Sequence, residues 1–290
     1  MAAILLQNSD CLKTVTFENV TPKTMNNLKQ IQSFILILSL SVFFTLNVNG
    51  QTNEKNRNID LVFIGNSITQ GVQNDNPQEN APPATACAYL RLQKGIASAR
   101  FLNRGRSGNT TVDFLPSADG ELSKVIIAAR EFHNDNSRLL IFSISLGTND
   151  SAEEGPNGSP LSPDAYRQNI KSITDKLLSE FPDSKIVYQQ PIWYSPTTYN
   201  RSRYLAAGLA RLQSYFPELK SLVEQYSQTN PGHVLMGDLK GFEYFRNNYL
   251  TDLIPESGNA GTFYLHPNKK GAVALGRLWG DGIYQSVFKD

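Results

Sequence analysis

The chain has 290 residues, of which 40% are hydrophobic and 18% are charged, with 27 Lys and Arg against 26 Asp and Glu. This composition excludes a disordered or collagen-like chain, because it supplies apolar residues for a core and an ordinary share of glycine and proline. The net charge of +1, without a cluster of basic residues, argues against a nucleic-acid-binding surface.

An apolar run over residues 34–46 lies near the N-terminus. It follows a lysine and ends close to Gly50, which is the layout of a signal peptide with cleavage after that glycine. The run is too short for a transmembrane helix, which needs about 20 apolar residues. The residues before Met25 do not have the basic start of such a peptide, so we expect translation to begin at Met25. We therefore predict an upstream extension and signal peptide over residues 1–50, and export of a single domain, residues 51–290, to the periplasm or the medium.

Two cysteines, Cys11 and Cys87, are too few for a disulfide framework and have no clustered histidines for a zinc site. Cys87 stands between two alanines and is expected to pack in a helix. The exported domain must therefore depend on its core, which a domain of this size can supply by burying about 70–75% of its unfolded surface.

The rest of the chain alternates apolar runs with helical patterns. Continuous apolar runs suit parallel strands that are covered on both faces, and five are expected at residues 60–65, 99–103, 139–147, 185–190 and 233–237. Helical spacing predicts helices over residues 122–132, 162–181, 204–226 with a break at Pro217, and 269–288. This alternation predicts an α/β fold with helices on both faces of a parallel sheet, and a site beyond the carboxyl ends of its strands.

Polar residues that can perform acyl transfer follow three of these strands. Ser67 stands on a glycine-flanked turn after the first strand and can present its hydroxyl above the sheet. Gly108 after the second strand and Asn149 after the third can offer N–H groups to an oxyanion. His266, near the C-terminus, can accept the serine proton. Because parallel strands end at the same edge of the sheet, we expect these residues to converge there.

The segments around these four residues resemble, in the same order, the four sequence blocks of the SGNH, or GDSL, hydrolase superfamily. The resemblance implies a flavodoxin-like, three-layer α/β/α sandwich with a five-stranded parallel sheet, and the activity of a serine esterase. It implies that Ser67 is the nucleophile, that the oxyanion hole consists of Ser67, Gly108 and Asn149, and that His266 is the general base. It implies no metal and no cofactor.

Two residues depart from the family pattern. Asn66 replaces the aspartate of the Gly-Asp-Ser block and leaves the serine on its turn. Phe263 stands three residues before the histidine, where the family has the aspartate that orients it. A neutral histidine needs its second ring nitrogen held so that the correct tautomer faces the serine. In order of preference, a backbone carbonyl, a water molecule, or a carboxylate from the preceding loop, Glu256 or Asp252, could hold it.

The substrate is indicated by residues beside the predicted site. Trp193, Tyr194 and Tyr199 offer aromatic faces that suit a sugar ring, although packing of the loop alone explains Trp193 and Tyr199 equally well. Arg104 and Arg106 flank the second block and could meet a carboxylate or a uronic acid, although an exposed arginine is usually only solvated. With an export signal and a family that includes carbohydrate acetylesterases, these residues favour an esterase that removes O-acetyl groups from a glycan such as xylan, pectin or a sialic-acid-containing chain.

Two other functions are compatible with the same sequence. One is a short-chain carboxylesterase or lipase-like acylhydrolase without a preference for sugars. The other is a catalytically inactive glycan-binding protein of the same fold, which the loss of the aspartate at Phe263 would explain. In each case we expect a small-molecule or polysaccharide partner, no nucleic acid and no stable insertion into a membrane. The particular glycan, the acetyl position and the oligomeric state do not follow from the sequence.

Overall fold

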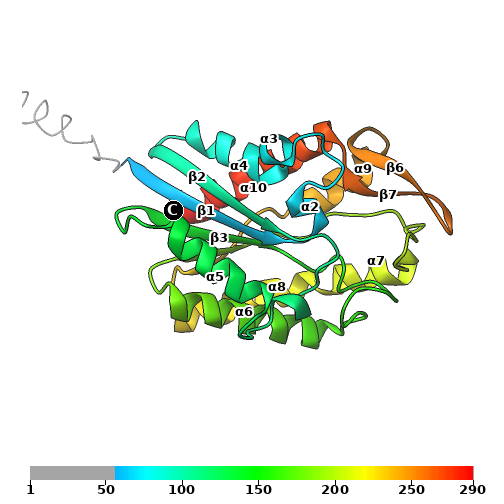
Figure 1. Ribbon diagram of the computed structural model, residues 1–290, viewed down its shortest axis with the longest axis horizontal. Helices are drawn as coiled ribbons and strands as arrows, with labels where there is room; N and C mark the ends of the chain where they lie inside the picture. The colour runs from blue at the N-terminus through cyan, green and yellow to red at the C-terminus, as the bar shows by residue number, and fades with distance from the viewer. Residues whose placement is uncertain (1–55, 290) are drawn as a thin grey trace, which may run out of the picture. The chain divides into compact units, whose positions relative to one another are not determined.

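Five parallel strands form the centre of the fold (Figure 1). The computed structural model describes residues 56–289. The strands are β1 (Arg57–Gly65), β2 (Ile96–Gly105), β3 (Leu139–Ser145), β4 (Lys185–Tyr188) and β5 (Val234–Met236). They lie in the spatial order β2-β1-β3-β4-β5, and each pair of neighbours is parallel. All five predicted strands are therefore confirmed, and this order is the flavodoxin-like arrangement.

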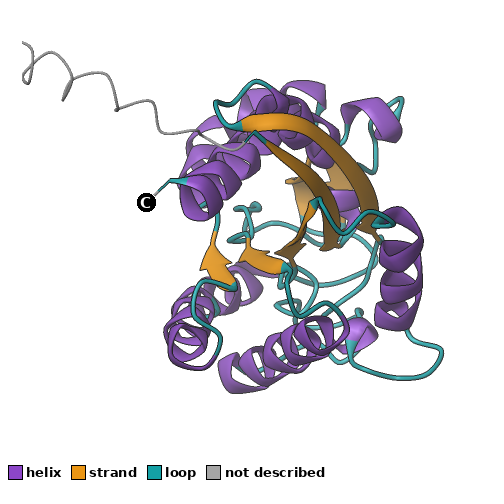
Figure 2. Ribbon diagram, turned by 90° about the vertical axis from the view of Figure 1, so that its left-hand side faces the viewer, coloured by secondary structure: helices purple, strands orange, loops and turns teal. Residues whose placement is uncertain are grey.

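Helices cover both faces of the sheet (Figures 1 and 2). One layer contains α4 (Pro82–Arg91) and α10 (Lys269–Phe288), and the other contains α5 (Glu121–Phe132), α6 (Pro163–Glu180) and α8 (Phe216–Thr229). Phe63 of β1 stacks on Trp279 of α10, with 6.1 Å between ring centroids. Phe142 of β3 points to the opposite face and contacts Phe181, at the end of α6, at 5.3 Å. The predicted three-layer α/β/α sandwich is confirmed.

The helix predicted over residues 204–226 is two helices, α7 (Leu205–Ser214) and α8. The break falls at Tyr215, and Pro217 lies in the first turn of α8, where its missing N–H leaves no hydrogen bond unmade. Ser162 caps α6, because its Oγ accepts a hydrogen bond from the Ala165 N–H at 3.1 Å. Four further helices complete the described part of the chain: α2 (Ser67–Gln70), α3 (Pro77–Asn80), η1 (Val112–Phe114) and α9 (Gly241–Asp252).

A two-stranded hairpin separate from the main sheet was not predicted. It consists of β6 (Leu253–Gly258) and β7 (Gly261–Pro267), which pair antiparallel. The loop after β4 holds this hairpin in place, because Ser195 N donates to the Tyr264 carbonyl and Tyr264 N donates to Ser195 Oγ, both at 2.9 Å. Asn259 N donates to the Tyr199 carbonyl at 2.7 Å. The hairpin matters because His266 lies on β7.

The predicted extension and signal peptide lie outside the described residues. None of the helices within residues 56–289 is long and apolar enough to cross a membrane.

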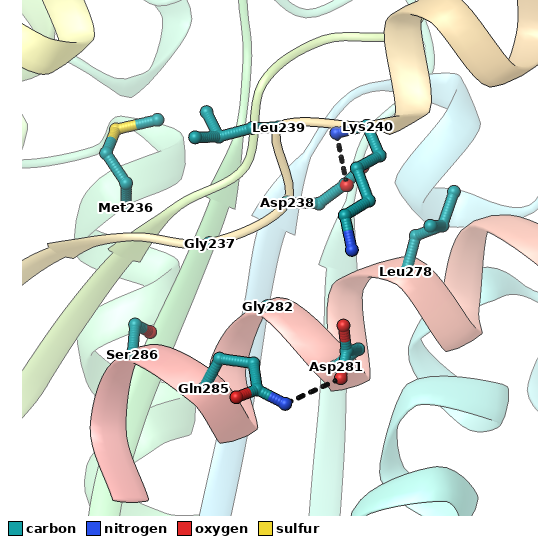
Figure 3. A pocket seen from close by; sticks show the side chains of 10 residues that line it. All are labelled: Met236, Gly237, Asp238, Leu239, Lys240, Leu278, Asp281, Gly282, Gln285 and Ser286. Carbon is teal, nitrogen blue, oxygen red and sulfur yellow. Dashed lines mark hydrogen bonds between the residues drawn. The ribbon is translucent and has the colours of Figure 1, made fainter. Parts of the chain in front are cut away.

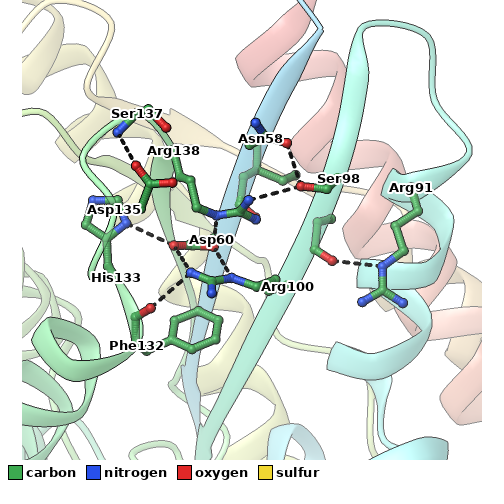
Figure 4. Close-up of polar contacts among 12 residues, drawn as sticks. Asn58, Asp60, Arg91, Ser98, Arg100, Phe132, His133, Asp135, Ser137 and Arg138 are labelled. Atoms are coloured by element: carbon green, nitrogen blue, oxygen red, sulfur yellow. Dashed lines mark hydrogen bonds and ion pairs between the residues drawn. The ribbon is translucent and has the colours of Figure 1, made fainter.

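A buried charge cluster lies at the amino end of the sheet (Figure 4). Asp60 of β1 is 0% exposed. Its carboxylate accepts hydrogen bonds from two nitrogens of Arg100 at 2.9 and 2.8 Å and from Arg138 Nε at 2.6 Å. His133 Nδ1 lies 3.0 Å away. Burial alone would raise the pKa of Asp60, but these partners hold it below its ordinary value.

Replacing Asp60 by Asn removes the charge that pairs with Arg138, whose side chain is 10% exposed. Removing one partner of a buried ion pair costs about 3–5 kcal/mol, and we expect urea unfolding at pH 7 to show a loss of that size. The pKa of Asp60 is lower in the folded chain than in the unfolded one. Its contribution is therefore complete above about pH 4 and is lost as the pH falls through the folded pKa.

The difference between wild type and Asp60→Asn should accordingly shrink in acid. The exposed Asp183 gives a matched control, Asp183→Asn, which should unfold like the wild type at each pH. A difference that stayed constant between pH 7 and about pH 3 would contradict a stabilising role for the charge of Asp60.

Candidate active site

The turn after β1 presents the Ser67 hydroxyl at the carboxyl end of the sheet. Asn66 caps α2, because its Oδ1 accepts a hydrogen bond from the Ile68 N–H at 3.0 Å. The turn requires glycine at position 65, since a Cβ there would lie 2.0 Å from Thr69 Oγ1 and 2.7 Å from the Ser145 carbonyl. The asparagine that replaces the family aspartate therefore leaves the serine at the start of the helix, where it is 7% exposed.

His266 lies within hydrogen-bond distance of this serine. Its Nε2 is 3.0 Å from Ser67 Oγ, and its Nδ1 is 2.9 Å from Glu256 Oε1. A carboxylate only accepts hydrogen bonds, so Nδ1 carries the proton and Nε2 is free to accept the serine hydroxyl. The structure thus brings Ser67 and His266 together as expected from their motifs, although 199 positions separate them in the chain.

The group that orients His266 is Glu256, and the stated preference for a backbone carbonyl is wrong. Glu256 lies on β6 directly opposite Phe263 of β7 in the register of the hairpin. In the family the orienting carboxylate stands at the position of Phe263. Here it comes instead from the neighbouring strand, at the residue that pairs with Phe263. The other candidate, Asp252, instead pairs with Lys270 Nζ at 2.6 Å and accepts from Tyr244 Oη at 2.7 Å. Phe263 is 1% exposed and belongs to the core.

Glu256 is held in its charged form. Burial alone would raise the pKa of Glu256, but the hydrogen bond and charge of His266 and the amide of Gln73 lower it below its ordinary value. Gln73 Nε2 donates to Glu256 Oε2 at 2.8 Å, so each carboxylate oxygen has a partner. Gln73 has a φ of 72°, in the sparsely populated left-handed region, which is a strained conformation for a residue with a side chain. Sequence reasoning did not identify this residue.

Two of the three residues expected in the oxyanion hole, Gly108 and Asn149, lie in neighbouring loops. Gly108 has a φ of 82° and lies next to Asn109, whose carbonyl accepts a hydrogen bond from Asn149 Nδ2 at 2.8 Å. Asn149 Oδ1 in turn accepts from Tyr204 Oη at 2.7 Å. These two bonds fix which end of the Asn149 amide faces which way, and they leave its second N–H available for a ligand. Tyr204 thus orients Asn149 from a distant part of the chain, and no signal in the sequence marks it.

Asp150 connects the same two loops through hydrogen bonds to Thr111. It is fully buried, and its Oδ1 accepts hydrogen bonds from Thr111 N at 2.8 Å and from Thr111 Oγ1 at 2.5 Å. Burial raises the pKa of Asp150 to about 6. In the structure it holds the loop that contains Gly108 against the loop that contains Asn149.

The expectation that Tyr194 contacts the substrate is wrong. Its side chain is 0% exposed, its hydroxyl lies 3.0 Å from Ser151 Oγ, and its ring packs edge-on against Tyr204 at 5.5 Å. Trp193 is 8% exposed and lies against Tyr249 at 5.2 Å. Both aromatic rings therefore pack the loop, which for Trp193 was the alternative interpretation. Arg106 is exposed, and its Nε lies 3.4 Å from Glu121.

A hollow lies between the end of β5 and α10 (Figure 3). It is lined in part by Asp238, but none of the four motif residues Ser67, Gly108, Asn149 and His266 lines it. The Asp238 carboxylate accepts hydrogen bonds from Lys240 N at 2.7 Å and from Gly241 N at 2.9 Å, at the start of α9. Asp238 therefore stabilises its own loop and does not orient His266.

Comparisons with known proteins agree with this geometry. The model of the GDSL-like Lipase/Acylhydrolase family matches residues 63–274. This range is most of the chain and contains all four motifs, so the chain belongs to this family. It is a GDSL-family acylhydrolase, and the family implies an ester substrate. A comparison with curated proteins found no significant match.

Solved structures show the same fold at low sequence identity. Est24, a carbohydrate acetylesterase from Sinorhizobium meliloti, is 16% identical with a TM-score of 0.51, over 78% of this chain and 98% of its own. Axe2, an acetylxylan esterase from Geobacillus stearothermophilus, is 17% identical with a TM-score of 0.53, over 82% and 97%. An aryl esterase from M. smegmatis is 14% identical with a TM-score of 0.51, over 78% and 99%. At these identities the likeness establishes the fold.

Replacing Glu256 by Gln should impair catalysis while the fold persists. Gln removes the negative charge that stabilises protonated His266 and no longer selects one tautomer of its ring. Loss of the equivalent charge from a triad lowers turnover by about 10⁴, and we expect kcat for p-nitrophenyl acetate to fall by about 10²–10⁴, with KM little changed.

The matched control for this prediction is Glu243→Gln, an exposed glutamate on α9 that pairs with Arg246. It should retain wild-type kcat. If the Glu256 variant lost no more activity than this control, His266 would not depend on Glu256.

Proposed function

We propose that the protein is a serine esterase that removes acetyl or other short acyl groups from a carbohydrate. The observation that carries the proposal is the continuous chain of hydrogen bonds from Glu256 through His266 to Ser67. Such a chain activates a serine hydroxyl as a nucleophile. Two of the similar structures are named as a carbohydrate acetylesterase and an acetylxylan esterase, which supports a sugar ester as the substrate.

The first half of the reaction forms an acyl-enzyme. Ser67 Oγ attacks the ester carbonyl while His266 Nε2 takes the hydroxyl proton, and Glu256 stabilises the imidazolium. The carbonyl oxygen becomes an oxyanion that the N–H groups of Ser67 and Gly108 and the second N–H of Asn149 stabilise, each such donor being worth about 10²–10³ in rate. Collapse of this intermediate breaks the C–O bond to the sugar, and His266 returns its proton to the leaving hydroxyl.

The second half of the reaction regenerates the enzyme. His266 takes a proton from a water molecule, which attacks the carbonyl carbon of acyl-Ser67. The same N–H groups stabilise the second oxyanion. Its collapse breaks the bond to Ser67 Oγ, which recovers a proton from His266, and the carboxylic acid leaves. In both halves of the reaction Ser67 acts through its hydroxyl, His266 through its imidazole, and the oxyanion hole through its N–H groups.

The alternative of an inactive glycan-binding protein loses its main support. It depended on the missing carboxylate at Phe263, and Glu256 contacts His266 in its place. A short-chain carboxylesterase without a preference for sugars is the second candidate, and the similarity to an aryl esterase favours it. Export through the predicted signal peptide belongs to the proposal, because an enzyme that acts on an extracellular polysaccharide must meet its substrate there.

The test compares the chain from Gln51 onward with Ser67→Ala and His266→Ala on p-nitrophenyl acetate and on acetylated xylan. Removing an acting nucleophile or its base should lower kcat/KM by about 10³ or more. A pocket built for acetyl groups should also reject p-nitrophenyl octanoate. Preference for acetylated xylan over the aryl ester supports the carbohydrate substrate, whereas comparable rates on long and short acyl esters support the second candidate.

Controls separate chemistry from folding in this test. His233 lies at the amino end of β5, where its Nδ1 contacts the Ser184 carbonyl, and Ser286 lies on α10. His233→Ala and Ser286→Ala should keep wild-type activity. Esterase activity that survived in Ser67→Ala would rule out the proposed nucleophile.

A further inference from the structure

We propose that a cavity beside α2 binds a carboxylate of the substrate, so that the preferred ester belongs to an acidic glycan, such as one that contains uronic acid. This inference rests on the proposed function and narrows its substrate class. The cavity has a volume of about 360 Å³, within the range of small-molecule sites.

The position of the cavity suits a second part of the same substrate. Gln70, which lines it, is the last residue of the four-residue helix that begins at Ser67, so the two backbones are about 4.5 Å apart along the axis. Gln70 Oε1 accepts a hydrogen bond from Ser107 N at 2.7 Å, next to Gly108. The cavity therefore adjoins both the serine turn and the oxyanion loop. In the proposed complex, a sugar next to the esterified one would occupy it.

The chemistry of the lining suits an anion. Among the described residues that line the cavity are Arg104 and Arg106, with the side-chain amides of Gln70, Gln78 and Asn103, and no carboxylate. An arginine presents a planar fork of N–H donors that matches a carboxylate in two parallel hydrogen bonds. Amide groups around such a fork suit the hydroxyl groups of a sugar.

Arg104 has unused hydrogen-bonding capacity. Its Nε is buried and meets no acceptor among the described residues. A buried donor without an acceptor is costly, and a charged one more so. Burial, together with the like charge of Arg106, lowers the pKa of Arg104. A carboxylate in the cavity would offset the repulsion between the two guanidinium groups.

An acidic neighbour of this pair, Glu121, does not replace such a ligand. Glu121, at the start of α5, lies 3.4 Å from Arg106 Nε and also accepts a hydrogen bond from Lys124 Nζ at 2.7 Å. The Arg106 side chain is 51% exposed, so the pair is a weak surface contact. Arg104 and Arg106, which line the cavity, therefore have Glu121 as an acidic neighbour that also pairs with Lys124, and the local charge is positive.

The first experiment measures binding without turnover. Trigalacturonic acid, which contains no ester, is titrated calorimetrically into the wild type, Arg104→Gln and Arg106→Gln, with uncharged xylotriose as the neutral probe. Loss of a charge-assisted hydrogen bond costs about 1.5–3 kcal/mol, so Kd for the acidic probe should rise about 10- to 100-fold. Binding of xylotriose should not change.

The matched control is Lys124→Gln, which removes the same charge beside Glu121 but does not line the cavity. It should bind trigalacturonic acid within about twofold of the wild type, and added salt should weaken acidic binding in both. Equal affinity of the wild type for the two probes, or unchanged affinity in both arginine variants, would overturn the proposal. Inorganic phosphate that bound as tightly as the acidic sugar would reduce the cavity to a general anion site and would also overturn it.

A kinetic comparison keeps this proposal distinct from the esterase function. All three variants should hydrolyse p-nitrophenyl acetate like the wild type, because that ester has no carboxylate. On acetylated oligogalacturonide, Arg104→Gln should raise KM about 10- to 100-fold with kcat little changed. A wild type that was inactive on both esters would contradict the esterase function, while the binding result would stand by itself. An equal loss on both esters would contradict the carboxylate site alone.

Discussion

The hydrogen bond between Ser67 and His266 is the contact on which the site depends, because it joins two separate sheets. Ser67 starts the helix after β1 of the main sheet, whereas His266 lies on the hairpin of β6 and β7. Contacts of the residues before and after His266 in the chain fix the position of its imidazole. Two residues later, Asn268 caps α10 by accepting a hydrogen bond from Gly271 N at 3.0 Å. On the other side, the loop after β4 is bonded to the hairpin backbone at Tyr264.

The hairpin also explains how the site retains a carboxylate without the family aspartate. Phe263 and Glu256 are direct partners in its antiparallel register, so one strand can supply the charge that the other lacks. Phe263 then contributes to the core, and the Glu256 carboxylate satisfies both its oxygens with His266 and Gln73. Asp150 and Tyr204 position the residues of the oxyanion hole in a similar way. Asp150 accepts a hydrogen bond from Thr111, and Tyr204 donates one to Asn149, so each bond joins two different loops. Catalytic geometry here depends on contacts between elements far apart in the chain.

The sequence predicted what local patterns determine. Apolar runs located all five strands, and the polar residues at their ends located Ser67, Gly108 and Asn149, because parallel strands deliver their carboxyl ends to one edge. Contacts set by long-range pairing could not be predicted in this way. Glu256 requires the register of a hairpin whose strands lack clear alternation, and Tyr204 requires the packing of α7 against the site. The burial of Tyr194 was missed for the same reason, since an aromatic residue in a loop has no local sign of whether it faces solvent or core.

The most direct test of this account is to trap the acyl-enzyme. Wild-type protein is mixed with p-nitrophenyl acetate, quenched in acid during turnover and digested, and the peptides are sequenced by mass spectrometry. The account predicts one acetyl group, on Ser67, that disappears as substrate is exhausted and is absent from Ser67→Ala. An acetyl group found on another residue during turnover, or steady turnover of the ester in Ser67→Ala, would contradict it.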